Sequence, residues 1–303
     1  MPDAATQRLE VLKTYKLLID GKFPRTESGR SMPVYDAKGR AIAHACLASR
    51  KDVRDAVEAA RKAQPGWASA TAYLRGQILY RMSEMLEGKK GEFVELLDAT
   101  TSAKVTRTAA RPRSAREREV TTAIDRLVAY AGWADKYAQV LGCNNPVSGP
   151  YYNFTTPEAT GVVGVLAPDE LPLLGLVSLL APALCSGNCV VALASSRCPL
   201  AGAVFGEVCA TGDVPAGAVN VLTGDRTELL VHIATHREID AVHAAGLSPA
   251  QVTALQEGGA DNVKRLAVRN LDAAEWFDPQ TCENPWWIEP FVEMKTIWHP
   301  SGA

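Results

Sequence analysis

The chain has 303 residues, of which 47% are hydrophobic and 22% are charged, and its formal net charge at pH 7 is −2. This composition excludes a disordered chain and is typical of a globular protein with a sizeable core. The small net charge gives no reason to expect nucleic acid or an anionic membrane as a partner. Seven cysteines without a secretory signal pattern predict reduced thiols and a cytoplasmic location.

The N-terminal segment is predicted to form a hairpin and then a helix. Residues 15–23 form two short apolar runs around Asp20-Gly21, a dipeptide typical of tight turns. Ser49, with Asp52 three residues later, has the spacing of a capping box, which predicts that a helix begins there.

Further helices are predicted at 67–91, from 92 and around 124–140. Residues 104–119 carry six basic and two acidic side chains, with no aromatic residue between them. We interpret this segment as a solvated helical face, because nucleic-acid patches usually interleave aromatic side chains with basic ones.

From residue 161 the sequence alternates between apolar strands and helical segments. A doubly wound, Rossmann-like α/β fold with a parallel sheet covered on both faces is predicted, because such strands read as continuous apolar runs. No GxGxxG motif is present. The longest apolar run, 171–193, is read as a helix followed by a buried strand rather than a membrane span. The four predicted strands are 161–167, 189–194, 218–223 and 239–245.

Motifs spread along the chain, in order, carry a family resemblance. They are LIDGKF (18–23), YAGWADK (130–136), LAPAL (180–184), DVPAGAVNVLTG (213–224), LQEGG (255–259) and FVEMKTIW (291–298). With these motifs the chain resembles the aldehyde dehydrogenase superfamily, and most closely the non-catalytic halves found in its sixteenth family. The resemblance is to a form that lacks the catalytic domain.

The resemblance implies a division of the chain into parts. Residues 1–140 and 160–262 would form a degenerate cofactor-binding domain, and 143–158 with 290–303 a β-structured oligomerisation arm. Residues 263–289 would be a linker in place of the catalytic domain, because so short a segment cannot form a further domain.

The catalytic positions implied by the resemblance hold unsuitable side chains. The family's oxyanion-binding Asn falls at Glu170, whose carboxylate accepts hydrogen bonds instead of donating them. The general base falls at Gln256, which takes up no proton at neutral pH. Cys282, in Gln280-x-Cys282, is the one candidate nucleophile, and we interpret it as an ordinary linker cysteine. Asp169 and Glu170 are predicted to be at least partly exposed.

The implied cofactor positions are substituted as well. The ribose-binding Lys and Glu fall at Leu193 and Ser196, and the pyrophosphate-binding Ser falls at Leu247. No bound cofactor is expected in this chain, and NAD is expected only in a partner subunit. The cysteine spacing matches no zinc pattern, so no metal site is expected.

Three functions are compatible with this pattern. The first is an inactive subunit that gives its arm to an intact NAD(P)-dependent aldehyde dehydrogenase, since family subunits exchange arm strands. The others are an NAD(H)-binding sensor and a divergent dehydrogenase that uses Cys282. Four tryptophans near the C-terminus, at 276, 286, 287 and 298, would either join that interface or cover the sheet. The predicted interface residues are Phe291, Val292, Met294, Ile297, Trp298, Tyr151 and Phe154.

Overall fold

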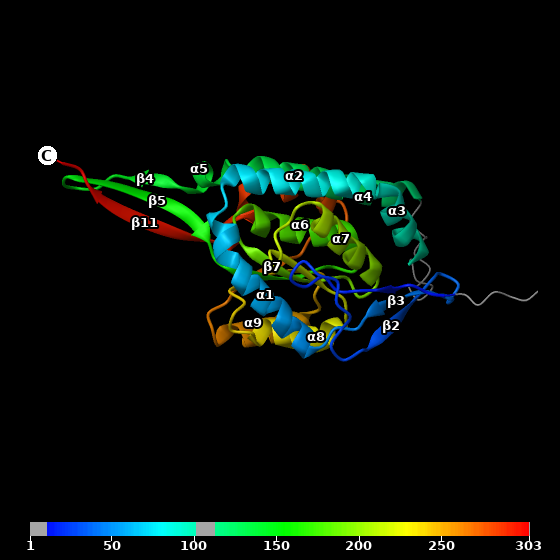
Figure 1. The fold of residues 1–303 in the computed structure, drawn as a ribbon. Helices are drawn as coiled ribbons and strands as arrows, with labels where there is room; N and C mark the ends of the chain where they lie inside the picture. Colours follow the sequence, from blue (N-terminus) through cyan, green and yellow to red (C-terminus); the bar gives the residue numbers. More distant parts are fainter. Residues whose placement is uncertain (1–10, 101–112, 303) are drawn as a thin grey trace, which may run out of the picture.

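The computed structural model describes residues 11–100 and 113–302, and Figure 1 shows their arrangement. Its centre is a five-stranded parallel sheet with the strand order β10-β9-β6-β7-β8. The doubly wound α/β fold is therefore confirmed. The strands are β6 (Val162–Leu166), β7 (Cys189–Leu193), β8 (Val219–Leu222), β9 (Ala241–Ala245) and β10 (Arg265–Arg269).

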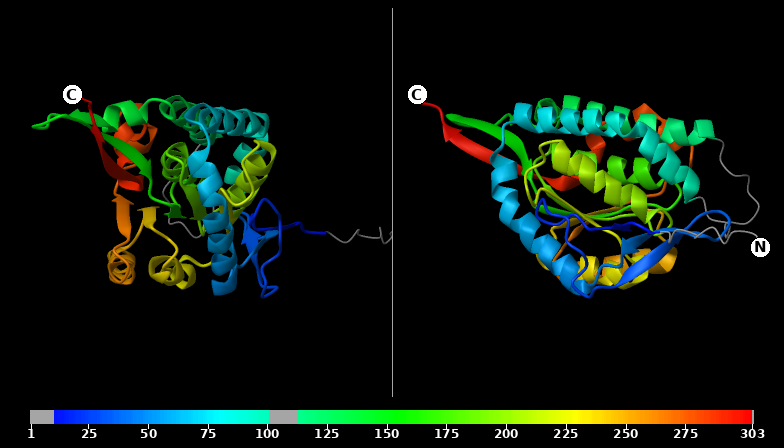
Figure 2. Two further views of the ribbon diagram at one scale, coloured as in Figure 1. Left: turned by 60° about the vertical axis from the view of Figure 1, so that its left-hand side comes forward. Right: turned by 45° about the vertical axis from the view of Figure 1, so that its right-hand side comes forward.

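Helices cover both faces of this sheet (Figures 1 and 2). On one face lie α6 (Pro172–Cys185) and α7 (Pro199–Thr211), with α2 (Ala72–Gly88), α3 (Lys90–Ala99) and α4 (Arg113–Trp133) outside them. On the other face lie α1 (Arg50–Ser69), α8 (Arg226–Thr235) and α9 (Pro249–Ala260). Strands β6 to β9 are buried along their whole length, which explains their continuous apolar sequences.

The helix boundaries follow local capping. The side chain of Ser49 caps α1 in a capping box with Asp52, as predicted. The predicted helix at 67–91 is instead divided, because α1 ends at Ser69 and Thr71 caps the new helix α2 by accepting from the backbone N–H of Leu74. The helix expected around 124–140 is likewise α4 and, after a break, α5 (Tyr137–Leu141).

The predicted hairpin closes one edge of the parallel sheet. Asp20 and Gly21 both have positive φ, as a tight mirror-image turn requires. The backbone N–H of Leu18 donates to the carbonyl of Val221 in β8, so the hairpin covers the edge of this strand. A small separate sheet, β1 (Thr14–Tyr15), β3 (Ala41–Cys46) and β2 (Ser31–Tyr35), lies beside it.

A three-stranded antiparallel sheet projects from the body of the molecule (Figures 1 and 2). Its order is β11-β5-β4, and we call it the arm. Residues 293–300 of β11 are exposed, and this strand pairs with β5 but has an open outer edge among the described residues. The arm strands are β4 (Cys143–Asn145), β5 (Tyr151–Ala159) and β11 (Val292–Pro300).

The segment predicted as a linker is structured. It begins with β10, which pairs in parallel with β9 and so extends the central sheet. Residues 275–291, which we call the cap, then pack on the body through Trp276 and Trp287, both buried in the main hydrophobic core. These two tryptophans cover the protein interior, whereas Trp286 and Trp298 are exposed. The cap consists of η1 (Glu275–Phe277), α10 (Pro279–Cys282), η2 (Pro285–Trp287) and η3 (Glu289–Phe291).

The basic segment 104–119 lies partly outside the described residues. Its described part is the start of α4, where Arg116 and Glu119 are buried. The prediction of a solvated face is therefore wrong for these two side chains, because α4 packs against α3 and α6 at this point.

Candidate functional site

The parallel strands end at a common edge of the sheet, where a crevice is expected in folds of this type. The loops 167–171, 194–198 and 246–248 follow β6, β7 and β9 at this edge. The structure brings the predicted positions Glu170, Ser196 and Leu247 to this edge, whereas Gln256 and Cys282 lie on other elements.

Asp169 connects two of these loops. Its Oδ1 accepts a hydrogen bond from the hydroxyl of Ser195 at 2.7 Å and from the backbone N–H groups of Ser196 at 2.8 Å and Arg197 at 3.3 Å. The Nη2 atom of Arg226 lies 3.1 Å from the same oxygen. One carboxylate oxygen of Asp169 is therefore the acceptor for these hydrogen-bond donors at the start of the β7–α7 loop.

Arg226 connects the third loop to the same site. It is the first residue of α8, and only 7% of it is exposed. Its guanidinium donates to the carbonyl of Ala167 and, at 3.2 Å, to the carbonyl of Gly246. The cation is thus fixed by two carbonyls as well as by Asp169.

Glu170 lies beside the β9–α9 loop. A Cβ atom placed on Gly246, whose φ is +64°, would lie 3.3 Å from Glu170 Oε2. Glu170 is exposed, and the side chain of Asp169 is 21% exposed and paired. The prediction that both acids are at least partly exposed is confirmed.

The other predicted cofactor positions are apolar or already bonded. Leu193 is buried at the end of β7, and Leu247 packs partly against the core. Ser196 is exposed, but its backbone N–H is bonded to Asp169.

A buried acid that we did not predict lies at the start of α6. Glu119, on α4, accepts hydrogen bonds from the backbone N–H groups of Leu173 at 3.1 Å and Leu174 at 3.4 Å. A carboxylate here is favourable, because the first N–H groups of a helix lack partners within the helix. The contact spans 54 residues, so no local signal in the sequence could have identified it.

Gln256 does not occupy a strand end. It is exposed on α9, which Ser248 caps in a capping box with Gln251. The capping box begins the helix that contains LQEGG, and this helix continues through Gly258 and Gly259. The next strand is β10, and it places Arg269 at the edge of the sheet.

Arg269 contacts a buried histidine. Its Nε donates to His243 Nε2 at 3.0 Å, and its guanidinium lies 4.3 Å from the ring centroid of Trp287 in the cap. His243 Nδ1 therefore carries the proton and donates to the carbonyl of Leu179 at 2.8 Å. Burial, and then the charge of Arg269, hold the pKa of His243 well below its usual value.

This burial predicts acid sensitivity. The unfolded chain takes up a proton at His243 near pH 6.5 and the folded chain does not, so stability declines as pH falls below about 6.5. The free energy of unfolding is expected to fall by up to about 1.4 kcal/mol per pH unit from this group. Urea unfolding between pH 7.5 and 5 measures it. His243→Gln can keep both hydrogen bonds and should show a flatter profile. Identical slopes for the two proteins would contradict this assignment.

Cys282 lies in the cap, and its thiol is buried. Its Sγ contacts the carbonyl of Glu275 at 3.3 Å. Burial raises the pKa of the thiol, although Arg126 opposes the shift. A nucleophilic cysteine needs a lowered pKa and access to substrate, so this environment is that of a structural residue. All seven cysteines, each within the described ranges, are free thiols.

The predicted interface residues divide into two groups. Phe291 and Val292 are buried in the chain's own core, with the Phe291 ring 4.7 Å from that of His243, so their prediction as interface residues is wrong. They precede the point at which β11 leaves the body. Exposed side chains on the arm are Tyr151, Met294, Ile297 and Trp298, and Phe154 is half-buried.

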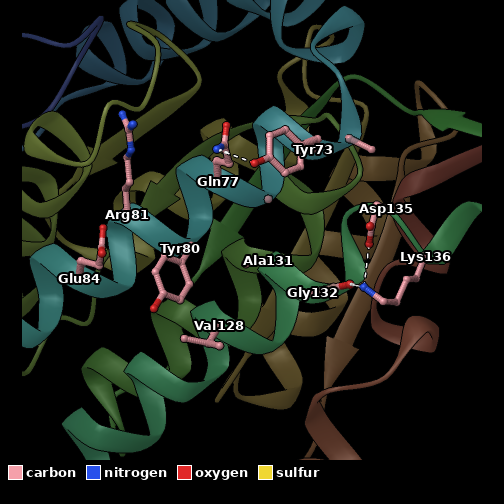
Figure 3. A pocket seen from close by; sticks show the side chains of 12 residues that line it. Tyr73, Gln77, Tyr80, Arg81, Glu84, Val128, Ala131, Gly132, Asp135 and Lys136 are labelled. Carbon is pink, nitrogen blue, oxygen red and sulfur yellow. Dashed lines mark hydrogen bonds and ion pairs between the residues drawn. The ribbon is translucent and has the colours of Figure 1, made fainter.

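A surface groove between α2 and α4 was not predicted (Figure 3). Its volume is about 450 Å³, and small residues lie between aromatic ones along its lining. The Tyr73 hydroxyl accepts a hydrogen bond from Gln77 within it. The groove shares no residue with the carboxyl edge of the sheet. Side chains that line it include Tyr73, Gln77, Tyr80 and Val128.

In residues 11–100 and 113–302 no group of three or more His, Cys, Asp or Glu side chains is placed to hold a metal ion. Over the same ranges, no helix combines the length and the apolar character that a membrane crossing needs.

Comparisons with known proteins agree with the fold. Retinal dehydrogenase 2 of Gallus gallus is 32% identical over 267 residues, which is 87% of this chain and 49% of the relative. Omega-crystallin of Enteroctopus dofleini is 28% identical over 261 residues, covering 85% and 50%. The chain spans about half the length of these relatives.

Solved structures give the same result. PnpE from Pseudomonas sp. WBC-3 has a TM-score of 0.77 and 26% identity, over 84% of this chain and 50% of that one. An aldehyde dehydrogenase from Bacillus cereus, the G224D mutant, also has a TM-score of 0.77, with 24% identity over 87% and 54%. The model of the aldehyde dehydrogenase family matches residues 24–269, ending with β10. The chain belongs to the aldehyde dehydrogenase family.

Proposed function

We propose that this chain is a non-catalytic member of its family that contributes its arm to an intact NAD(P)-dependent aldehyde dehydrogenase. The observation that carries the proposal lies at the carboxyl edge of the sheet, where Asp169 accepts the hydrogen bonds of the backbone N–H groups in the β7–α7 loop, so that they are not free for a ligand. The motifs that define the fold are retained next to this edge, whereas the side chains that the family's chemistry needs are replaced.

The dinucleotide that the family implies does not fit these residues. Its phosphates need free N–H donors and positive charge at this edge. Here Asp169 accepts the hydrogen bonds of these donors and pairs with the positive charge of Arg226. Glu170 adds a negative charge beside Gly246. Leu193 is buried and offers no hydrogen bond to a ribose.

The side chains at the family's catalytic positions do not fit aldehyde oxidation either. A carboxylate at Glu170 repels a developing oxyanion. Loss of one neutral hydrogen-bond donor to an oxyanion typically lowers the rate by about 10²–10³. The Cys282 thiol is buried with a raised pKa. These features support a subunit without its own turnover.

The arm supports a role in assembly. Tyr151 and Trp298 lie on one face of the arm, with ring centroids 5.7 Å apart, and Phe154 pairs with Ile297 on the other face. Exposed aromatic side chains on a small sheet whose outer strand has an open edge are a liability unless another chain covers them. Addition of β11 to a partner's sheet would give hydrogen-bond partners to the unpaired backbone groups of its outer edge and would bury these side chains.

Co-expression tests the proposal. The chain is produced together with intact aldehyde dehydrogenases of the source organism and analysed by size-exclusion chromatography with light scattering. A stable hetero-oligomer is the expected result. A soluble monomer that forms no complex with any of them would contradict the proposal.

A divergent dehydrogenase is the second candidate, favoured by the similarity to proteins named as dehydrogenases over 80–87% of this chain. It is tested by assaying the purified chain for NAD⁺ reduction with a panel of aldehydes that includes retinal. We expect no turnover. Turnover that Cys282→Ser abolishes would establish this second candidate instead.

A further inference from the structure

We propose that Asp169 is a built-in anion that fills a phosphate-type binding site of this chain. The site consists of the Ser195 hydroxyl, the backbone N–H groups of Ser196 and Arg197, and the guanidinium of Arg226. Its ligand class is a small phosphate-type anion, which binds where the Asp169 carboxylate now lies.

The number of donors indicates a larger anion than a carboxylate. Four donors converge on the single oxygen Oδ1 of Asp169, at 2.7, 2.8, 3.1 and 3.3 Å. A carboxylate oxygen offers about two lone-pair directions. A phosphate would share the same donors among three oxygens. The donor set therefore matches a phosphate better than the side chain that fills it.

The site keeps its shape without Asp169. Arg226 is held by the carbonyls of Ala167 and Gly246, and the Ser195 hydroxyl accepts from the N–H of Cys198 at 3.2 Å. Removal of the carboxylate would take from a nearly buried guanidinium the counter-ion that lies 3.1 Å away, which is unfavourable and attracts an anion from solution. The donors are thus pre-organised for a ligand.

A small anion can reach the site from solvent. The side chain of Asp169 is 21% exposed, and Ser196 and Arg197 border it at the surface. A dinucleotide is a poorer ligand, because Glu170 and the buried Leu193 flank the same edge. In the native chain an anion must displace a tethered carboxylate, whose effective concentration is high.

The test uses thermal unfolding with inorganic phosphate as the probe. Wild-type chain and Asp169→Ala are compared in 0 and 50 mM phosphate, with chloride keeping the ionic strength equal. The midpoint of Asp169→Ala is expected to rise by about 2 °C or more, and that of the wild type to stay constant. Calorimetry then gives a millimolar dissociation constant for the variant only.

Two controls separate the site from a general change in charge. Glu170→Ala removes the neighbouring carboxylate, which makes none of the four contacts, and should gain no phosphate response. Asp169→Ala combined with Arg226→Gln should lose the response. Asp169→Ser, whose shorter side chain leaves the position of the carboxylate empty, provides a second route if Asp169→Ala fails to fold. If neither folded Asp169 variant responds to phosphate more than Glu170→Ala does, the inference is wrong.

This inference goes beyond the proposed function and does not depend on it. Phosphate binding is measured on the isolated chain, whereas the proposed function is tested by complex formation. A phosphate response without a complex, or a complex without a phosphate response, identifies which of the two is wrong.

Discussion

Replacement of Arg126 by Met is expected to lower the free energy of unfolding by about 3–5 kcal/mol, the largest stability loss that we predict. Arg126 is 0% exposed and lies 3.1 Å from the carboxylate of Glu283. It also donates to Ser178 Oγ at 3.0 Å and to the carbonyls of Trp276 at 3.0 Å and Cys282 at 3.5 Å. One cation therefore joins α4, α6 and the cap.

The loss is large because Met leaves the partners of Arg126 without their donor. The carbonyl of Trp276 and the half-buried Glu283 lose a hydrogen bond, whereas the carbonyl of Cys282 keeps the one from the Tyr130 hydroxyl at 2.8 Å. Urea unfolding followed by tryptophan fluorescence measures it. Arg113→Met is the matched control on the same helix, because its exposed pair with Glu117 is worth less than about 1 kcal/mol. Equal stabilities of the two variants would contradict this account of the cap.

If the chain forms the proposed hetero-oligomer, replacement of Trp298 by Lys is expected to weaken that complex by about 30-fold or more. Trp298 is 58% exposed on β11, and interface tryptophans commonly contribute 2 kcal/mol or more. A lysine keeps the strand but removes the aromatic surface that a partner would bury. Sedimentation or interferometry with the partner dehydrogenase measures the dissociation constant.

Trp286→Lys is the control for this prediction. Trp286 is 59% exposed but lies in the cap, so its replacement should leave the affinity of the arm unchanged. Equal losses for both variants would show that the arm is not the docking element. Wild-type affinity for Trp298→Lys would show that the interface lies elsewhere.

Much of the fold could be predicted from the sequence. The strands β6 to β9 are fully buried, so their apolar runs identify them without knowledge of their neighbours. The turn at Asp20-Gly21 and the cap at Ser49 also follow from local chemistry. Strand β10 was missed because it lies at the edge of the sheet and is only partly buried, with charged residues at both ends.

The candidate site was harder to predict than the fold. Glu170, Leu193 and Leu247 were identified through the family resemblance, and the ends of the parallel strands β6, β7 and β9 bring them to one edge of the sheet. The pairing of Asp169 with Ser195 spans 26 residues and depends on how two loops meet in space, which no local pattern encodes. Gln256 lies on α9 rather than at a strand end, because the capping box at Ser248 begins a helix there.

Titration of the purified wild-type chain with NAD⁺ and NADP⁺ by calorimetry tests the central claim most directly. If the chain's own acids close the carboxyl edge, no binding is expected up to about 1 mM of either nucleotide. A dissociation constant in the micromolar range would contradict the claim. It would favour a nucleotide sensor or an active dehydrogenase, and it would require the loop that carries Asp169 to open.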